Sequence, residues 1–326
     1  MKYKISTNDY LHGGTDRDYY GESEVECCLC PLCSSQNHIK IYKERGHIGI
    51  VDCMECGLTY TNPRAINAET NYFGDETLFY NEARLIFDGQ KTHHRDKNYE
   101  FELREMQKIK AHGKLLDIGT NMGFFLNKAR QFGFDVCGVE PSTSLAKIAT
   151  DKFHLRIANS FFNKSLFDNE KFDIVTMIDV FEHVTEPLGI LSDIHQIMKN
   201  DGLLCIKVPN GNYNKLKLKL ARAFKREDFH DIFNGYEHVV HYTSETMKKM
   251  LDKQGFKIKK TILPLPIHPP LWANLVGHYY QYPSPFILDW KRRITRELFY
   301  IIGKMEKTFG MKIEFAPDLM FMIEKK

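Results

Sequence analysis

A short stretch of small and acidic residues carries the strongest chemical signal in this sequence. Asp117 ends an apolar run, Gly119 and Gly123 follow it, and Glu140 stands 21 residues after Gly119. Glycine lets a backbone approach a ligand closely, and a carboxylate at the end of the next strand can accept hydrogen bonds from both ribose hydroxyls. The pattern predicts that a nucleoside-bearing ligand binds at the carboxyl edge of a parallel sheet.

The order of the acid and the glycines distinguishes this site from a dinucleotide site. The dinucleotide fingerprint reads Gly-x-Gly-x-x-Gly, whereas here the glycines read Gly-x-x-x-Gly and Asn121 stands between them. Asparagine tolerates the left-handed backbone of such a turn. A carboxylate ahead of the turn suits a ligand with cationic groups. S-adenosylmethionine has an ammonium and a sulfonium group, so we predict that this cofactor binds Asp117, Gly119, Asn121, Gly123 and Glu140.

A second group of polar residues follows a predicted buried strand. The run Phe172–Ile178 is mostly apolar, which is typical of a parallel strand, and the sequence Asp-Val-Phe-Glu-His-Val follows it from Asp179. We expect Asp179 to contribute to the cofactor site and His183 to lie at the same sheet edge. A purely structural role, in which Glu182 and His183 cap and pack the next helix, stays open.

Two places in the chain could supply a general base. Transfer of a sulfonium methyl is an in-line displacement, so alignment and desolvation are the main demands on the protein. A hydroxyl or acidic carbon acceptor also needs a base, and histidine titrates near neutral pH. One candidate is His183, and the other is the group Glu237, His238 and His241. Each histidine also fits a structural role, and the sequence does not choose among them.

Two C-x-x-C pairs near the amino terminus have the spacing of a zinc site. Four thiolates surround zinc tetrahedrally and close it to water, so the predicted Zn²⁺ is structural. Cys27 offers an alternative first pair with Cys30, and whether Cys27 or Cys28 joins the site stays open. Disulfides do not persist in a reducing cytoplasm. The four predicted ligands are Cys30, Cys33, Cys53 and Cys56.

Hydrophobic patterns and turn signals predict the elements that must position these residues. A helix over 95–112 precedes the first strand, and Ser142 caps a helix that reaches about Phe153. A later helix begins at Thr243 or Ser244 and ends at Gly255. The remaining predicted strands lie near Leu155, after a turn at Asn200-Asp-Gly, from Phe256 onward, and over Leu319–Ile323.

The segment from Asp117 to Glu140 resembles motif I and the following acidic strand end of class I S-adenosylmethionine-dependent methyltransferases. It departs from the commoner pattern at Asn121, where the family usually has a glycine. The resemblance implies an α/β, Rossmann-like sheet of seven strands whose last strand is antiparallel. It covers residues 95–326, which follow a zinc-ribbon module at 1–64 and an aromatic and polar entry segment at 65–94.

The run from Cys53 to Arg64 resembles a ribbon found ahead of methyltransferase domains in bacterial glycan and sugar-modification clusters. The resemblance implies O- or C-methylation of a sugar, nucleotide-sugar or glycan precursor in polysaccharide biosynthesis. Sugar C-methyltransferases use a Glu-His pair in a position comparable to Glu237-His238. The spacing from this pair to Tyr242 is one residue longer here.

Two insertions interrupt the predicted methyltransferase domain. The first, near 211–240, contains a basic run over 215–226. This run fits either a solvated helix face or a lid over a phosphorylated substrate. The second insertion, near 264–316, begins with prolines and aromatic residues and ends in an amphipathic helix. A substrate cover, a dimer surface and a contact with a membrane-borne lipid carrier all stay open for it.

Composition limits the classes of partner. The 326 residues have a formal net charge of +3, with 27% charged and 43% hydrophobic residues, which is ordinary for a globular enzyme. The near-balanced charge argues against nucleic acid as a partner, and so against the alternative of an rRNA or tRNA methyltransferase with an RNA-binding ribbon. No apolar run is long enough to span a bilayer, and the amino terminus has no signal core, so we expect a cytoplasmic enzyme. The methyl acceptor and the oligomeric state cannot be read from the sequence.

Overall fold

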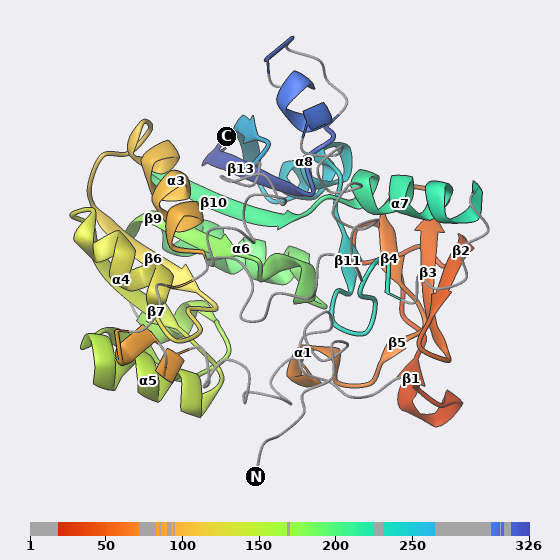
Figure 1. The fold of residues 1–326 in the computed structure, drawn as a ribbon, viewed down its shortest axis with the longest axis horizontal. Coiled ribbons are helices and arrows are strands. Elements are labelled where there is room, and N and C mark those ends of the chain that lie inside the picture. The colour runs from red at the N-terminus through yellow and green to blue at the C-terminus, as the bar shows by residue number, and fades with distance from the viewer. Residues whose placement is uncertain are drawn as a thin grey trace.

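The chain builds two larger β-sheets that lie side by side, each covered by helices (Figure 1). The computed structural model describes residues 19–71, 83–84, 86–89, 93, 95–167, 170–223, 231–264, 301–306, 308–309 and 314–326.

The larger sheet has seven strands among the described residues, in the order β12-β13-β10-β9-β6-β7-β8. Strands β8, β7, β6, β9 and β10 pair in parallel, whereas β13 is antiparallel to both β10 and β12. The predicted seven-stranded α/β sheet with an antiparallel last strand is confirmed. The strands are β6 (Lys114–Ile118), β7 (Asp135–Val139), β8 (Arg156–Ala158), β9 (Phe172–Ile178), β10 (Met198–Pro209), β12 (Phe256–Ile262) and β13 (Asp318–Lys325).

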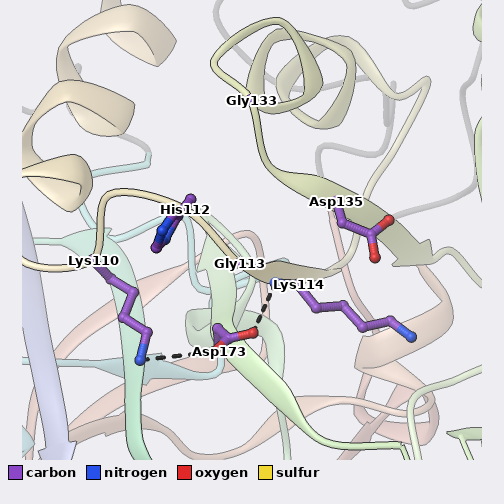
Figure 2. Close-up of a pocket in the computed structure, with 7 residues that line it drawn as sticks. All are labelled: Lys110, His112, Gly113, Lys114, Gly133, Asp135 and Asp173. Atoms are coloured by element: carbon purple, nitrogen blue, oxygen red, sulfur yellow. Dashed lines mark hydrogen bonds and ion pairs between the residues drawn. The ribbon is translucent and has the colours of Figure 1, made fainter.

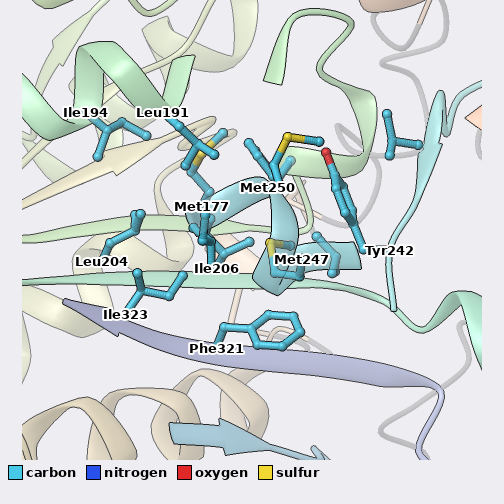
Figure 3. Close-up of a cluster of buried hydrophobic side chains, with 14 of the residues drawn as sticks. Met177, Leu191, Ile194, Leu204, Ile206, Tyr242, Met247, Met250, Phe321 and Ile323 are labelled. Atoms are coloured by element: carbon cyan, nitrogen blue, oxygen red, sulfur yellow. The ribbon is translucent and has the colours of Figure 1, made fainter. Parts of the chain in front are cut away.

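Helices cover both faces of this sheet, because successive side chains of each strand point to opposite sides. On one face, Leu103 of α3 and Leu126 of α4 join a buried apolar cluster. On the other face, Leu191 of α6 and Met250 of α8 join a second cluster, which Figure 3 shows against β9, β10 and β13. The helices are α3 (Asp96–Gln107), α4 (Phe124–Gln131), α5 (Thr143–Phe153), α6 (Pro187–Ile197) and α8 (Ser244–Lys253).

The predicted helix caps are present, but two predicted boundaries are wrong. Ser142 accepts a hydrogen bond from the backbone of α5, and Thr243 does the same for α8. Helix α3 ends at Gln107, earlier than the predicted residue 112. The predicted turn at Asn200 lies inside β10, where the pairing with β9 shifts register. Strong pairing on both sides of that strand overrides the local turn signal.

The smaller sheet joins the amino-terminal residues to a much later segment. Its order is β11-β4-β3-β2, and all neighbours are antiparallel. The alternating residues Ile39–Tyr42 and Ile48–Val51 between the cysteine pairs predict a hairpin, which is confirmed as β2 and β3. Because β11 comes from the first insertion, the module predicted at 1–64 shares its sheet with residues 240–241, and the domain boundaries stay a prediction. The strands are β2 (His38–Glu44), β3 (Ile48–Cys53), β4 (Thr59–Thr61) and β11 (Val240–His241).

The basic run of the first insertion begins in helix α7 (Gly211–Ala223), which lies over the smaller sheet (Figure 1). Leu218 of this helix packs with Ile50 of β3 and with Phe233. Lys215 forms an ion pair with Asp52 of β3, with 2.8 Å between Nζ and Oδ1. One face of the helix is therefore buried against the smaller sheet, and the question of a lid for substrate stays open.

Short elements connect the two sheets. Strand β1 (Val25–Glu26) pairs with β5 (Arg64–Ala65), and helix α1 (Ala68–Asn71) follows. Three-residue and four-residue 3₁₀ turns cover 22–24, 164–167 and 181–183.

Some sequence predictions fall on residues that lie outside the described ranges. These are most of the entry segment, including Tyr72, Phe73, Phe79, Tyr80 and His94, and residues 265–300 of the second insertion. Within the described ranges, none of the helices combines the length and apolar character needed to cross a bilayer.

Candidate active site

The loop between β6 and α4 has the left-handed backbone that its sequence predicts. The φ angles of Gly119, Asn121 and Gly123 are 78°, 52° and 82°. A Cβ atom on Gly119 would lie 2.5 Å from Val180 Cγ2, and one on Gly123 would lie 2.7 Å from Leu155 Cδ1. Both glycines are thus required by the packing of the protein itself, a reason that the sequence did not reveal.

Glu140 holds the end of β7 against this loop. One carboxylate oxygen accepts the backbone N–H of Asn121 at 2.7 Å, and the other accepts that of Ser142 at 2.9 Å. The side chain is only 3% exposed. The contact joins the β6–α4 loop to the start of α5, and it places a carboxylate at the carboxyl edge of the sheet, where parallel α/β sheets bind ligands.

Asp117 lies beneath the same loop. Its Oδ1 accepts a hydrogen bond of 2.6 Å from Thr176 Oγ1. Burial raises the pKa of Asp117 to about 7, and the hydrogen bond from Thr176 offsets only part of that effect. Among the described residues, Asp117 forms no ion pair with lysine or arginine. The carboxyl edge of the sheet therefore has a carboxyl group that a cationic ligand could pair with.

Asp179 is already paired with cations of the protein. It forms ion pairs with Arg95 and with Lys207, whose Nζ lies 3.1 Å from Oδ1. Burial raises the pKa of Asp179, but these two charges more than offset that effect and hold the pKa well below the usual range of a carboxyl. Glu102 and Asp318 complete the charged group, at 3.6 and 3.7 Å from Lys207 Nζ.

Arg95 and Lys207 were missed by sequence reasoning. The available signal was a lysine within the apolar run of β10, because a charged residue is rarely buried unless it is paired. The other cation, Arg95, precedes α3 and offers no comparable signal. The role of Asp179 toward a cofactor stays a prediction.

Next to Asp179, the structure brings together Glu182, His183 and His238, here called the Glu-His-His cluster. Each residue offers one atom that could bind a metal ion, and these three atoms all lie within 4.8 Å of one another. The imidazole rings of His183 and His238 meet edge to face, with centroids 4.8 Å apart. His183 Nδ1 also lies 3.0 Å from the backbone carbonyl of Glu237. Two of the predicted bases are thus neighbours.

The other two predicted bases have different surroundings. His241 belongs to β11, and its Nε2 lies 3.2 Å from Thr61 Oγ1 in the smaller sheet. Burial lowers the pKa of His241 to about 3, so the ring is neutral at pH 7. The carboxyl group of Glu237 is buried near Arg45, and burial raises its pKa to about 7. These contacts favour a structural role for His241.

The four predicted cysteine ligands converge at one end of the smaller sheet. The Sγ atoms of Cys30 and Cys56 are 3.5 Å apart, those of Cys33 and Cys53 are 3.4 Å apart, and all four lie within 4.8 Å of one another. Zinc–sulfur bonds of about 2.3 Å place tetrahedral thiolates about 3.8 Å apart, so the cluster could hold a zinc ion. Cys28 Sγ instead lies 3.7 Å from the Thr61 carbonyl, and Cys27 is exposed.

The knuckles that carry these cysteines are attached to the larger sheet through α8. Lys249 Nζ donates to the backbone carbonyl of Cys56 at 3.0 Å, and Lys253 Nζ donates to that of Leu32 at 2.6 Å. The cysteine cluster is therefore fixed relative to the helix that packs on β12.

One surface hollow lies far from these groups along the strands. Figure 2 shows it at the start of β6, where Lys110 and the backbone of Lys114 both face Asp173. This is the amino edge of the parallel strands, opposite the edge where such sheets bind ligands, so we do not assign the active site to it. The lining residues are Lys110, His112, Gly113, Lys114, Gly133, Asp135 and Asp173.

Comparison with protein families finds one model that matches residues 92–261, about half of the chain. The model describes a methyltransferase domain. The matched region contains the β6–α4 loop, Glu140, Asp179 and the Glu-His-His cluster, and it leaves out the cysteine cluster.

Individual relatives match part of the chain. A ubiquinone biosynthesis O-methyltransferase of Rhodopseudomonas palustris strain TIE-1 is 32% identical over 114 residues, which are 34% of this chain and 45% of that protein. A protein of the same name from Glaesserella parasuis serovar 5 is 32% identical over 161 residues, or 46% of this chain and 59% of that protein. The chain thus spans about half the length of the relatives it matches.

Among solved structures, a SAM-dependent methyltransferase of Thermotoga maritima superposes with a TM-score of 0.45 at 16% identity. That alignment covers 77% of this chain and 98% of the other.

Proposed function

The chain belongs to the family of methyltransferase domains, and from this premise we propose that it transfers a methyl group to a hydroxyl of a sugar, nucleotide-sugar or related glycan precursor. S-adenosylmethionine is the methyl donor of the class whose fold the domain has, and when bound it supplies an electrophilic methyl group. The residues of this chain would hold the donor, hold the acceptor and remove the proton of the acceptor.

The residues of the β6–α4 loop fit the donor. A carboxylate oxygen has two lone pairs, so each oxygen of Glu140 can accept a ribose hydroxyl in addition to its backbone N–H. Asp117 would face the ammonium group, since it lies at this edge without a described cationic partner. Gly119, Asn121 and Gly123 would shape the turn around the ligand. Asp179 is proposed as a further contact.

The acceptor side is proposed at the Glu-His-His cluster. Glu182 and His183 of this cluster follow β9 at the carboxyl edge of the sheet, close to Asp179. His183 and His238 are the proposed proton acceptors, because burial lowers the pKa of both imidazoles and leaves them neutral at pH 7. The neighbouring Glu237 orients His183 through its backbone carbonyl. This arrangement of neutral imidazoles beside the donor edge is the observation that carries the proposal of a hydroxyl acceptor.

Two observations support a sugar-type acceptor, and one supports another class. The basic helix α7 and the ribbon-like cysteine module are the features that favour a phosphorylated sugar. The relatives named for ubiquinone biosynthesis are O-methyltransferases, so a phenolic hydroxyl is the second candidate. An acceptor screen with methyl-labelled donor separates them, with nucleotide sugars in one arm and catechols in the other. Failure of the donor to bind the wild-type chain would contradict both.

The four cysteines are proposed to hold a structural zinc ion. Their Sγ separations suit tetrahedral coordination, and four thiolates leave no position for substrate. Metal analysis of the wild type and of Cys30→Ser tests this proposal, with loss of one zinc ion per chain as the expected result.

A further inference from the structure

The Glu-His-His cluster holds an imidazole nitrogen and a carboxyl oxygen that need a proton or a cation between them. The carbonyl of Glu237 can only accept a hydrogen bond, so His183 Nδ1, at 3.0 Å, must carry the proton. In the neutral imidazole the other nitrogen, Nε2, is then a lone-pair acceptor. This nitrogen faces Glu182 Oε1 at 4.0 Å. Both atoms are buried and close enough to share one proton or one cation.

The carboxyl group of Glu182 also lacks a hydrogen-bond partner at one oxygen. The side chain is 2% exposed, and its Oε2 has no hydrogen-bond partner among the described residues. The nearby cation Lys207 is committed to Asp179, Glu102 and Asp318. A buried carboxylate without a partner is costly, and burial accordingly raises the pKa of Glu182 well above its usual value. A cation bound beside it would restore the carboxylate.

His238 contributes a second imidazole to the cluster. Its ring meets that of His183 edge to face. Two hydrogen bonds fix the segment that carries it. The backbone N–H of Val239 donates to the Glu182 carbonyl at 2.9 Å, and the side chain of His183 donates to the Glu237 carbonyl. The three donors are thus held together by chain segments more than 50 residues apart in sequence.

We propose that Glu182, His183 and His238 bind a divalent transition-metal ion. Two imidazoles and one carboxylate are a common ligand set for zinc sites that keep a coordination position open. The carbonyl on His183 Nδ1 is the kind of outer contact that orients metal-binding histidines. Ligand atoms around a tetrahedral zinc lie about 3.4 Å apart, so the gap between Glu182 and His183 needs to close by only about 0.6 Å.

The catalytic role of this ion rests on the proposed function, whereas the binding of the ion can be tested without it. A divalent ion would lower the pKa of a hydroxyl bound to it. With their lone pairs on the ion, the two imidazoles would act as ligands in place of their role as bases, and the proton of the hydroxyl would pass to water. The site differs from the cysteine cluster, where four thiolates would close the ion to substrate. The chain would then carry one structural ion and one ion that an acceptor can reach.

The test is metal stoichiometry of the full chain after dialysis against Co²⁺, followed by its visible absorption. We expect Glu182→Gln and His238→Gln to hold one ion fewer than the wild type and to keep the thiolate-to-cobalt absorption. Cys30→Ser should lose that absorption and keep the other ion. The matched control is His112→Gln, an exposed histidine at the amino edge, which should hold as many ions as the wild type.

A wild type that holds only the thiolate-bound ion, with Glu182→Gln and His238→Gln unchanged, would overturn the proposal and leave a proton shared in the cluster. Binding of S-adenosylmethionine to each variant, measured by calorimetry, shows that the fold persists. If Glu182→Gln fails to fold, His238→Gln decides the outcome alone. Since counting ions needs no acceptor, this test can fail while methyl transfer stands, and the reverse also holds.

Discussion

The two halves of the candidate site share one sheet edge but are built in opposite ways. The cofactor half is local, because Asp117, Gly119, Asn121 and Glu140 all lie within two consecutive βα units and are joined by backbone hydrogen bonds. The acceptor half is assembled from distant segments, since Glu182 follows β9 whereas His238 comes from the first insertion. Under the proposed function, the donor would be held by the core of the fold and the acceptor by additions to it.

The amino-terminal module takes part in the acceptor half. Glu44, at the end of β2, accepts the backbone N–H groups of Phe233 at 2.8 Å and Gly235 at 2.6 Å. The next residue, Arg45, forms a two-bond ion pair with Asp231. Both contacts hold the segment that leads to His238. The cysteine module therefore has a positioning role that a separate binding domain would not have.

Glu140→Ala gives the largest expected effect and is confined to the cofactor half. It removes a charged acceptor from two ribose hydroxyls, and each such hydrogen bond is worth about 2 kcal/mol. We expect affinity for S-adenosylmethionine to fall roughly a thousandfold, which is about 4 kcal/mol, as measured by calorimetry. The exposed Glu186 provides the control variant Glu186→Ala. Affinity within a factor of about three of the wild type would remove Glu140 from the donor site.

The variant Arg45→Met tests whether the amino-terminal module supports the acceptor half. It leaves Asp231 buried without its ion-pair partner, which costs about 3 kcal/mol in free energy of unfolding. Because His238 would lose its support, we expect kcat to fall about tenfold while the affinity for S-adenosylmethionine stays unchanged. The control is Arg104→Met, which breaks an exposed pair with Glu100 and should change little. A parallel fall in donor affinity would mean that the two halves are not separately built.

The contrast between local and distant construction also explains what the sequence could predict. The strand β9 and the caps at Ser142 and Thr243 were predictable, because apolar runs and capping residues are local signals. The β2–β3 hairpin and the convergence of the four cysteines followed from spacing in the same way.

Contacts between distant segments could not be predicted from these signals. The pairing of Thr59–Thr61 with Val240–His241 depends on which strand edge is open after folding. The ion pairs of Asp179 with Arg95 and Lys207 depend on three separate elements meeting at one edge. The sequence therefore proposed His183, His238 and His241 without distinguishing them, and the structure separates His241 from the other two.

The pH dependence of donor binding sharpens the description of the cofactor half. Burial raises the pKa of free Asp117 to about 7, and a bound ammonium group would lower it. Asp117 must then lose a proton on binding below pH 7, so affinity should fall by up to about tenfold for each unit that the pH drops. Calorimetry in two buffers with different heats of ionisation should detect the released proton. In Asp117→Asn the release and the slope below pH 7 should both disappear, and a slope that persists would assign the titration to another group.

The smallest expected effect tests whether the loop glycine serves the fold or the ligand. Gly119 and Gly133 both have positive φ angles, 78° and 89°, but only Gly119 has no space for a Cβ atom, because Val180 lies 2.5 Å from its ideal position. Gly133→Ala should cost about 1 kcal/mol through backbone strain alone, and Gly119→Ala should cost roughly 1 kcal/mol more through the clash. Urea unfolding of both variants measures the difference, and Val180→Ala combined with Gly119→Ala should remove the excess. If the two single variants are equally stable and only donor affinity differs, then Gly119 is retained for the ligand, and the packing explanation is wrong.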